Sequence, residues 1–389
     1  MNPIKTLFSH DPRIAYLNHG SFGACPSPIF ENALAWQRAL EYEAVQFITK
    51  KGVAALKNAK DALGKYVGCA ADDLIFVQNP TWAINQVVKS LKLQAGDEVL
   101  TTDHEYGAMD KTFSFYSKKM GFRYVRQPIS LPLFSKEQFL EEFWKGYSEK
   151  TRVVFISQMT SSTALIFPAK EICERAKELG LITIVDGAHI PGHIPLNLAE
   201  IKADYYTGTL HKWLLAPKGS SFLYVNKACQ DSLEPLVISW GYESPIPEHR
   251  SKFLEENEVQ GTRDISAFLC TPSIFQFWED NDWAAKCEAC KQVILGNYER
   301  FCNLLNTKPL CALSSEFLGQ MCSIPIQTTR HDDLKECLYH DYGIEIPIMR
   351  RGNDSYIRIS YQAYNSLDDL DRLEQALKEI VAKGELLVI

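Results

Sequence analysis

An aspartate and a lysine lie near the ends of two apolar stretches in the middle of the chain. Asp186 is the last residue of stretch 181–186 (LITIVD), which is typical of a strand buried on both faces. Lys212 follows the strand-like stretch 203–210 and lies in the apolar sequence LHKWLLA. Because an ammonium group is costly to bury without a partner, a lysine in such surroundings is a candidate for chemistry.

An aspartate and a lysine at neighbouring strand ends suit a pyridoxal phosphate site, because open α/β sheets bind ligands at the carboxyl ends of their strands. A lysine amine bonds to the aldehyde of this cofactor. A carboxylate keeps the pyridine nitrogen protonated, so that the ring can accept the electrons of a substrate carbanion. Asp186 would make a poor helix cap, since the GAHIPGHIP that follows contains two glycines and two prolines. Lys212 alone could have a catalytic or a structural role, whereas its pairing with Asp186 favours a catalytic role.

The elements that must position this pair alternate between strand-like and helical patterns. Strands are predicted at 73–77, 97–102, 122–129, 151–159, 181–186, 203–210 and 220–225, and helices at 81–93, 104–121, 136–147 and 169–180. This alternation indicates βαβ units and an α/β fold with a mostly parallel, seven-stranded sheet.

The second part of the chain has a different organisation. A loop rich in proline and charge is predicted over 240–264, followed by two long helical patterns and then by mixed strands and helices. We therefore expect a large cofactor-binding domain over 21–260 and a smaller C-terminal α+β domain over 261–389.

Composition and charge exclude several classes of protein. The 389 residues are 46% apolar and carry a net charge of −7, which gives no electrostatic support for a nucleic-acid partner. No signal peptide and no membrane-spanning stretch are predicted. The 11 cysteines lack framework spacing, which favours reduced thiols in a cytoplasmic protein. Cys287 and Cys290 form a CxxC inside a helical pattern and are interpreted as a buried pair. The absence of a GxGxxG motif disfavours a nicotinamide cofactor.

Five segments occur together in the order of a known family: YLNHGSFGACP (16–26), TTDHEYGA (101–108), VDGAH (185–189), GTLHKWLLAPKG (208–219) and QGTRD (260–264). Across most of its length the chain resembles the fold-type I pyridoxal-phosphate enzymes of the class V aminotransferase family. It is most similar to isopenicillin N epimerase-like proteins, a group that includes C–S lyases. The resemblance implies an aspartate aminotransferase-like fold, pyridoxal 5'-phosphate, a small amino-acid-type substrate and a homodimer with active sites at the subunit interface.

The resemblance assigns the residues that contact the cofactor ring. Lys212 matches the Schiff-base lysine and Asp186 the partner of the pyridine nitrogen. His189 matches a donor to the phenolic oxygen, although a loop histidine without that role is the alternative. His104 is favoured as the group stacked on the ring, with Tyr106 close behind as stacking group or substrate contact.

The phosphate site is implied by a second set of residues. Pro80 and Thr81 lie between a predicted strand and its helix, where Thr81 can also be an ordinary N-cap. Thr209 and His211 match phosphate ligands of relatives. Thr262 matches a residue that relatives donate to the phosphate of the opposite subunit, which would require a dimer.

One departure from the family lies in the loop after the predicted strand 151–159. Some branches have an asparagine near the cofactor there, whereas this loop has the sequence TSSTA. Ser161 or Thr163 is expected to take its place.

The substrate carboxylate calls for a bidentate arginine. Arg358, in the segment YIRISYQAYN, matches the carboxylate-binding arginine of the family, with Arg263 and the pair Arg350 and Arg351 as alternatives. Residues 1–20 match a segment that lies over the active site in relatives, with Asn18 and His19 near the substrate.

The fate of the Cα proton separates the candidate reactions, with Lys212 as the nearest base. Return of a proton to the other face is epimerisation, and His104, Tyr106 or His19 could be a second acid. Loss of a β-thiol or β-sulfoxide group is C–S lyase chemistry, and a third alternative is transamination. No cysteine lies between Gly343 and Arg358, so a cysteine desulfurase mechanism is not expected. A catalytically idle relative is disfavoured, since Lys212 and Asp186 are both present.

Overall fold

The computed structural model describes residues 3–245 and 251–388. Its centre is a seven-stranded sheet in the order β2-β8-β7-β6-β5-β3-β4. Strand β8 runs antiparallel to both neighbours, and the other neighbouring strands are parallel, which confirms the predicted sheet. The strands are β2 (Leu74–Val77), β3 (Glu98–Thr102), β4 (Arg123–Gln127), β5 (Thr151–Ser157), β6 (Ile182–Gly187), β7 (Tyr205–Thr209) and β8 (Ser221–Val225).

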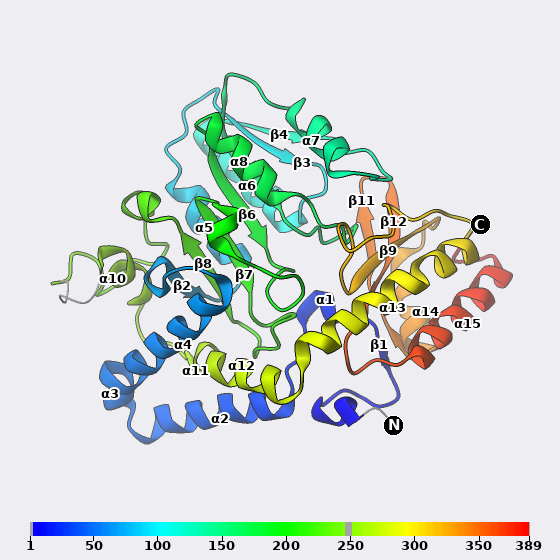
Figure 1. Cartoon of the computed structure of the whole chain (residues 1–389), viewed down its shortest axis with the longest axis horizontal. Coiled ribbons are helices and arrows are strands. Elements are labelled where there is room, and N and C mark those ends of the chain that lie inside the picture. The colour runs from blue at the N-terminus through cyan, green and yellow to red at the C-terminus, as the bar shows by residue number, and fades with distance from the viewer. Residues whose placement is uncertain (1–2, 246–250, 389) are drawn as a thin grey trace.

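The central strands of this sheet are buried on both faces, to which successive side chains of a strand point in turn. In β5, Val153 and Phe155 pack into one apolar cluster, whereas Val154 and Ile156 pack into another. Helices lie against the sheet in Figure 1: α5 (Pro80–Ser90), α6 (Gly107–Met120), α7 (Lys136–Trp144) and α8 (Ala169–Glu178). The short helix α9 (Leu198–Ile201) contacts α8. Packing on both faces therefore fixes the ends of the central strands side by side.

A second, antiparallel sheet in the order β11-β12-β9 lies at the other side of the molecule (Figure 1). It consists of β9 (Met321–Ile326), β11 (Ile348–Arg351) and β12 (Asp354–Ser360), accompanied by α13 (Trp283–Leu304), α14 (His331–His340) and α15 (Leu367–Lys383). In the N-terminal segment, β1 (Ala15–Tyr16) pairs in parallel with β10 (Ile344–Glu345). The N-terminal segment is thus joined to the C-terminal part of the chain. The domain limits at residues 20 and 261 remain predictions.

The remaining helices lie mostly along the left and lower parts of the molecule in Figure 1. They are α1 (His19–Phe22), α2 (Ser27–Tyr42), α3 (Ala44–Gln46), α4 (Gly52–Val67), α10 (Lys252–Glu258), α11 (Ser266–Leu269) and α12 (Thr271–Asp280), with short helical turns η1 (Pro3–Leu7), η2 (Phe47–Lys51), η3 (Ala71–Asp73) and η4 (Lys227–Ser232).

Helix α10 corrects the prediction of a continuous loop over 240–264, of which 246–250 lie outside the described residues. Ser251 caps this helix, because its hydroxyl accepts a hydrogen bond from the backbone N–H of Leu254 at 3.3 Å. Phe253 and Leu254 are buried against the sheet, so tertiary packing stabilises a helix that the local composition does not predict.

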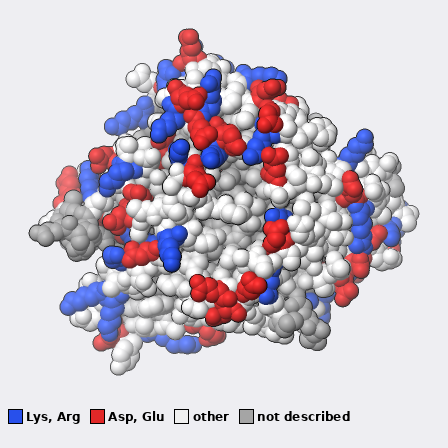
Figure 2. Space-filling view, viewed as in Figure 1, with Lys and Arg blue, Asp and Glu red and all other residues white. Residues whose placement is uncertain are grey.

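Charged side chains of both signs are interspersed around the rim of the face in Figure 2, with a broad uncharged area between them. Within the described ranges, no helix is long and apolar enough to cross a membrane. Cys287 and Cys290 are both buried in α13, in agreement with the interpretation as a helical core pair.

A buried ion pair fixes α10 against α4 and provides a test of the fold. Lys60 Nζ lies 2.8 Å from Glu258 Oε1, and both side chains are 5% exposed. Replacing Lys60 by alanine leaves a buried carboxylate without this partner, so the free energy of unfolding in urea should fall by about 3–5 kcal/mol. Lys57→Ala, which removes an exposed pair with Asp61 on the same helix, is the control and should change little. Equal effects of the two variants would contradict the role of the buried pair.

Candidate active site

A cavity of about 420 Å³ opens where the parallel strands end. Its walls include the last residues of two strands, Ser157 of β5 and Thr209 of β7, together with Asp186 near the end of β6. Most residues predicted for the site line this cavity, namely Pro80, Thr81, Tyr106, Ser161, Asp186, His189, Thr209, His211, Lys212 and Arg358.

Asp186 and Lys212 meet in the cavity because β6 and β7 are adjacent parallel strands, with Asp186 opposite Thr207. Asp186 is buried and accepts a hydrogen bond from the N–H of Ala188 at 2.9 Å. Burial raises the pKa of Asp186, against the effects of this hydrogen bond and of the Lys212 charge. Burial and the nearby charge of Arg358 lower the pKa of Lys212 to about 7. The charge of Asp186 opposes this shift, and the net effect favours the uncharged amine of Lys212.

His189 extends this pair on one side. Its Nε2 lies 3.3 Å from Lys212 Nζ, and its Nδ1 accepts a hydrogen bond from the indole N–H of Trp213 at 3.3 Å. Burial, with the charge of Lys212, lowers the pKa of His189 well below its ordinary value. A neutral ring that accepts at Nδ1 must carry its hydrogen on Nε2, which makes His189 a donor toward the cavity.

The N-terminus of α5 lies at another wall of the cavity, with Pro80 and Thr81 in its first turn. The N-cap is Asn79, whose side chain accepts from the N–H of Trp82 at 2.9 Å, and not Thr81 as the sequence allowed. Thr209 Oγ1 is buried and has no hydrogen-bond partner among the described residues. His211 also lines the cavity, with Nδ1 2.8 Å from the carbonyl of Ser220. Helix N–H groups and a free hydroxyl suit an anion.

Arg358 enters the cavity from β12 and is 1% exposed. One Nη atom donates to the carbonyl of Ser161 at 2.8 Å and lies 3.3 Å from its hydroxyl, and the other Nη donates to the Ser21 hydroxyl at 2.8 Å. Its Nε has no partner, and no Asp or Glu of the described residues forms an ion pair with it. A buried guanidinium without a carboxylate is prepared to bind an anionic ligand.

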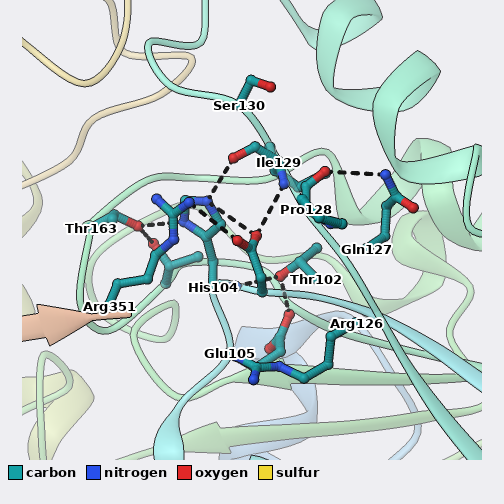
Figure 3. A network of polar contacts seen from close by, with 12 residues as sticks. Thr102, His104, Glu105, Arg126, Gln127, Pro128, Ile129, Ser130, Thr163 and Arg351 are labelled. Carbon is teal, nitrogen blue, oxygen red and sulfur yellow. Dashed lines mark hydrogen bonds and ion pairs between the residues drawn. The ribbon is translucent and has the colours of Figure 1, made fainter. Parts of the chain in front are cut away.

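The structure does not bring His104 into the cavity wall, although Tyr106 is there. His104 is buried, with Nδ1 3.0 Å from the Thr163 hydroxyl and Nε2 3.3 Å from the carbonyl of Ile129 (Figure 3). Both ring nitrogens therefore face protein groups, because the chain turns after β3 and directs His104 and Tyr106 to different sides. Thr163 belongs to the loop whose Ser161 holds Arg358, so His104 supports that loop.

The other predicted residues outside the wall lie in three places. Asn18 donates to Glu345 at 2.9 Å and accepts from the Ser21 hydroxyl at 2.5 Å, and His19 lies 3.0 Å from the carbonyl of Lys212, so both contact residues of the cavity wall. Thr262 and Arg263 line a separate hollow of about 160 Å³. The alternative Arg351 forms an ion pair with Asp103 at 3.2 Å (Figure 3).

Sequence reasoning missed two polar residues that support the site. Ser21 holds Arg358, and its position two residues after His19 in NHGSFG is the only local signal. Glu105 is buried and accepts hydrogen bonds from Ser157 at 2.5 Å and Thr102 at 2.7 Å (Figure 3 shows the latter). Burial raises the pKa of Glu105 to about 7. No pattern distinguishes this glutamate from a surface one.

Known proteins resemble the chain over nearly its full length. Residues 38–373 match the family Aminotransferase class-V. Isopenicillin N epimerase of Amycolatopsis lactamdurans is 32% identical over 386 residues, which cover 96% of each protein. L-cysteine desulfhydrase of Arabidopsis thaliana is 24% identical and covers 96% of this chain and 89% of its own length.

The fold also matches solved structures. A variant of C-DES with glycine covalently linked to its pyridoxal-phosphate cofactor superposes with a TM-score of 0.81 at 20% identity, covering 97% of this chain and 99% of its own. The match confirms the predicted fold-type I architecture. Together with the family match over 38–373, it identifies this chain as a member of the class-V aminotransferase family whose cofactor is pyridoxal 5'-phosphate.

Proposed function

We propose that the chain is an isopenicillin N epimerase-like enzyme that inverts the Cα of an amino acid or amino-acid derivative. The observation that carries this proposal is the convergence of Lys212, Asp186 and Arg358 in one cavity. Asp186 is the only carboxylate among the described residues of the wall, which also contains the amine of Lys212 and the guanidinium of Arg358. These two basic groups suit a ligand pair with a phosphate and a carboxylate.

The chain's residues fit the cofactor at each of its polar groups. We assign Lys212 to the aldehyde, Asp186 to the pyridine nitrogen and the Nε2–H of His189 to the phenolic oxygen. The unpartnered hydroxyl of Thr209 and the first turn of α5 at Thr81 suit the phosphate. Pro80 and His211 are assigned to the same phosphate site, and Ser161 is assigned a place beside Arg358. Pyridoxal phosphate, when bound, supplies an electron sink that stabilises negative charge at Cα.

The ring-facing role predicted for His104 is better supported for Tyr106. Tyr106 lines the cavity and is 48% exposed, whereas His104 is 1% exposed and does not line the cavity. We therefore propose Tyr106 as the group that covers the cofactor ring and His104 as support for the loop of Ser161.

Arg358 is proposed to bind the substrate carboxylate through the nitrogen hydrogens that Ser21 and Ser161 leave free. The carboxylate then fixes Cα near Lys212, whose neutral amine removes the Cα proton. Epimerisation needs a proton donor on the opposite face, and Tyr106 is the candidate that lines the cavity. His19 is less suited, because its ring nitrogens face Tyr364 and the carbonyl of Lys212.

A homodimer is part of the proposal. Thr262 and Arg263 line a hollow separate from the cavity of their own chain. This location is consistent with contribution of Thr262 to the phosphate site of a second copy.

A C–S lyase is the second candidate, supported by the L-cysteine desulfhydrase relative. It needs Lys212 as base and one acid for the leaving group, so the same wall residues suffice. An aminotransferase would use the same base. A desulfurase route through a persulfide is not proposed, because the described wall residues include no cysteine, and Cys322 and Cys337 lie in β9 and α14.

The attachment of the cofactor to Lys212 is directly testable. The purified protein should absorb near the edge of the visible range, and borohydride should remove this band and leave a mass adduct on the Lys212 peptide. Lys212→Ala should lack both signals, whereas Lys218→Ala, a control in the same segment, should keep them. A protein without an adduct at Lys212, even after added pyridoxal phosphate, would refute the site.

The reaction is tested by incubation with L-amino acids and cysteine conjugates in D₂O. An epimerase should give deuterium at Cα with inverted configuration, and Tyr106→Phe should slow inversion by about 10²-fold or more because the opposite proton donor is lost. Release of pyruvate without inversion would replace the epimerase by the lyase. A keto acid formed at the expense of the cofactor aldehyde would indicate transamination.

The role of Arg358 is tested by Arg358→Lys, which keeps the charge but loses the planar fork. We expect kcat/KM for a carboxylate substrate to fall by about 10–100-fold, which corresponds to the loss of a charge-assisted hydrogen bond. Arg350→Lys, at an exposed position in β11, is the matched control. If both variants keep the wild-type kcat/KM, another group binds the carboxylate.

A further inference from the structure

Trp213 follows Lys212 in the chain and is fully buried. Its indole N–H donates to Nδ1 of His189 at 3.3 Å. We infer that Trp213 is a positioning residue that fixes the tautomer of His189, so that the imidazole presents its Nε2–H to the cofactor. The inference rests on the proposed function, in which His189 donates to the phenolic oxygen.

The chemistry of the two rings leads to this assignment. An indole nitrogen can only donate, so Nδ1 of His189 must offer its lone pair. A neutral imidazole has one hydrogen on its two nitrogens, and that hydrogen must then lie on Nε2. His189 is held neutral, because burial and the charge of Lys212 keep its pKa well below the ordinary value. Without the indole donor, the hydrogen is free to occupy Nδ1, and Nε2 would present a lone pair to an acceptor oxygen.

The surroundings hold both rings in place. Trp213 stacks on His193, with ring centroids 4.0 Å apart and an interplanar angle of 27°. Nε2 of His193 accepts from the N–H of Gln320 at 2.5 Å, so its Nδ1 donates to the carbonyl of His189 at 2.9 Å. His189 is thus fixed at its backbone by His193 and at its ring by Trp213. Phenylalanine would retain the aromatic ring at position 213 but lacks the N–H.

The first test uses the cofactor-free full-length chain labelled with ¹⁵N-histidine. The nitrogen shifts of wild-type His189 should report Nε2–H, and Trp213→Phe should move them toward a mixture of tautomers. The matched control is Trp283→Phe, because Trp283 is equally buried and its indole N–H has no hydrogen-bond partner among the described residues. A wild-type Nδ1–H tautomer, unchanged shifts in Trp213→Phe, or an equal change in Trp283→Phe would overturn the inference.

The second test follows the visible absorption of the holoenzyme against pH. A hydrogen-bond donor beside the phenolic oxygen stabilises the deprotonated form of the chromophore. Loss of this donor in Trp213→Phe should therefore raise the pH midpoint of the absorption change by about 1–2 units. In a His189→Gln background the side-chain amide has fixed N–H donors and no tautomers. Trp213→Phe should then leave the pH midpoint unchanged. A shift of equal size in that background would overturn the inference. Failure of the cofactor assignment is distinguishable, because it would remove the adduct at Lys212 itself, whereas a different reaction would change only the products formed in D₂O.

Discussion

The structure depends on the burial of two basic side chains beside one carboxylate. Lys212 and Arg358 share a cavity whose described wall contains Asp186 as its only acid. Burial lowers the pKa values of both bases, of Lys212 to about 7 and of Arg358 to about 10, and the nearby charge of Arg358 adds to the shift of Lys212. Such an arrangement is costly in an empty site and becomes favourable when anionic groups of a cofactor and a substrate enter it.

The two bases come from different layers of the fold. Lys212 and Asp186 are fixed by the parallel sheet, where adjacent strands must end side by side. Arg358 is fixed by the antiparallel sheet. In the cavity its guanidinium is held by hydrogen bonds to Ser21 and Ser161, which belong to two distant segments. The parallel sheet thus carries the residues proposed to hold the cofactor, and the antiparallel sheet carries the arginine proposed to bind the substrate carboxylate.

Much of this arrangement is predictable from the sequence, since period and composition determine which strands end near one another. The seven strands and the Asp186–Lys212 pair follow from these properties, whereas the place of Arg358 in the cavity follows from the family resemblance. The direction of a side chain in a turn is not predictable in this way, because no periodicity applies there. His104 and Tyr106 lie two residues apart, yet only Tyr106 reaches the cavity. Likewise, α10 forms because Phe253 and Leu254 pack into an apolar cluster built from distant parts of the sequence. Ser21 is a site residue only because Arg358, far away in the sequence, donates a hydrogen bond to it.

The pairing of β1 with β10 also has a consequence for synthesis on the ribosome. Ala15 emerges early but pairs with Ile344, and Ser21 must wait for Arg358. The parallel sheet with Lys212 and Asp186 can form while these partners are still untranslated, because its strands end at Val225. The N-terminal segment therefore remains without these partners until Ile344 and Arg358 have been made, and the Arg358 side of the cavity is completed after the sheet.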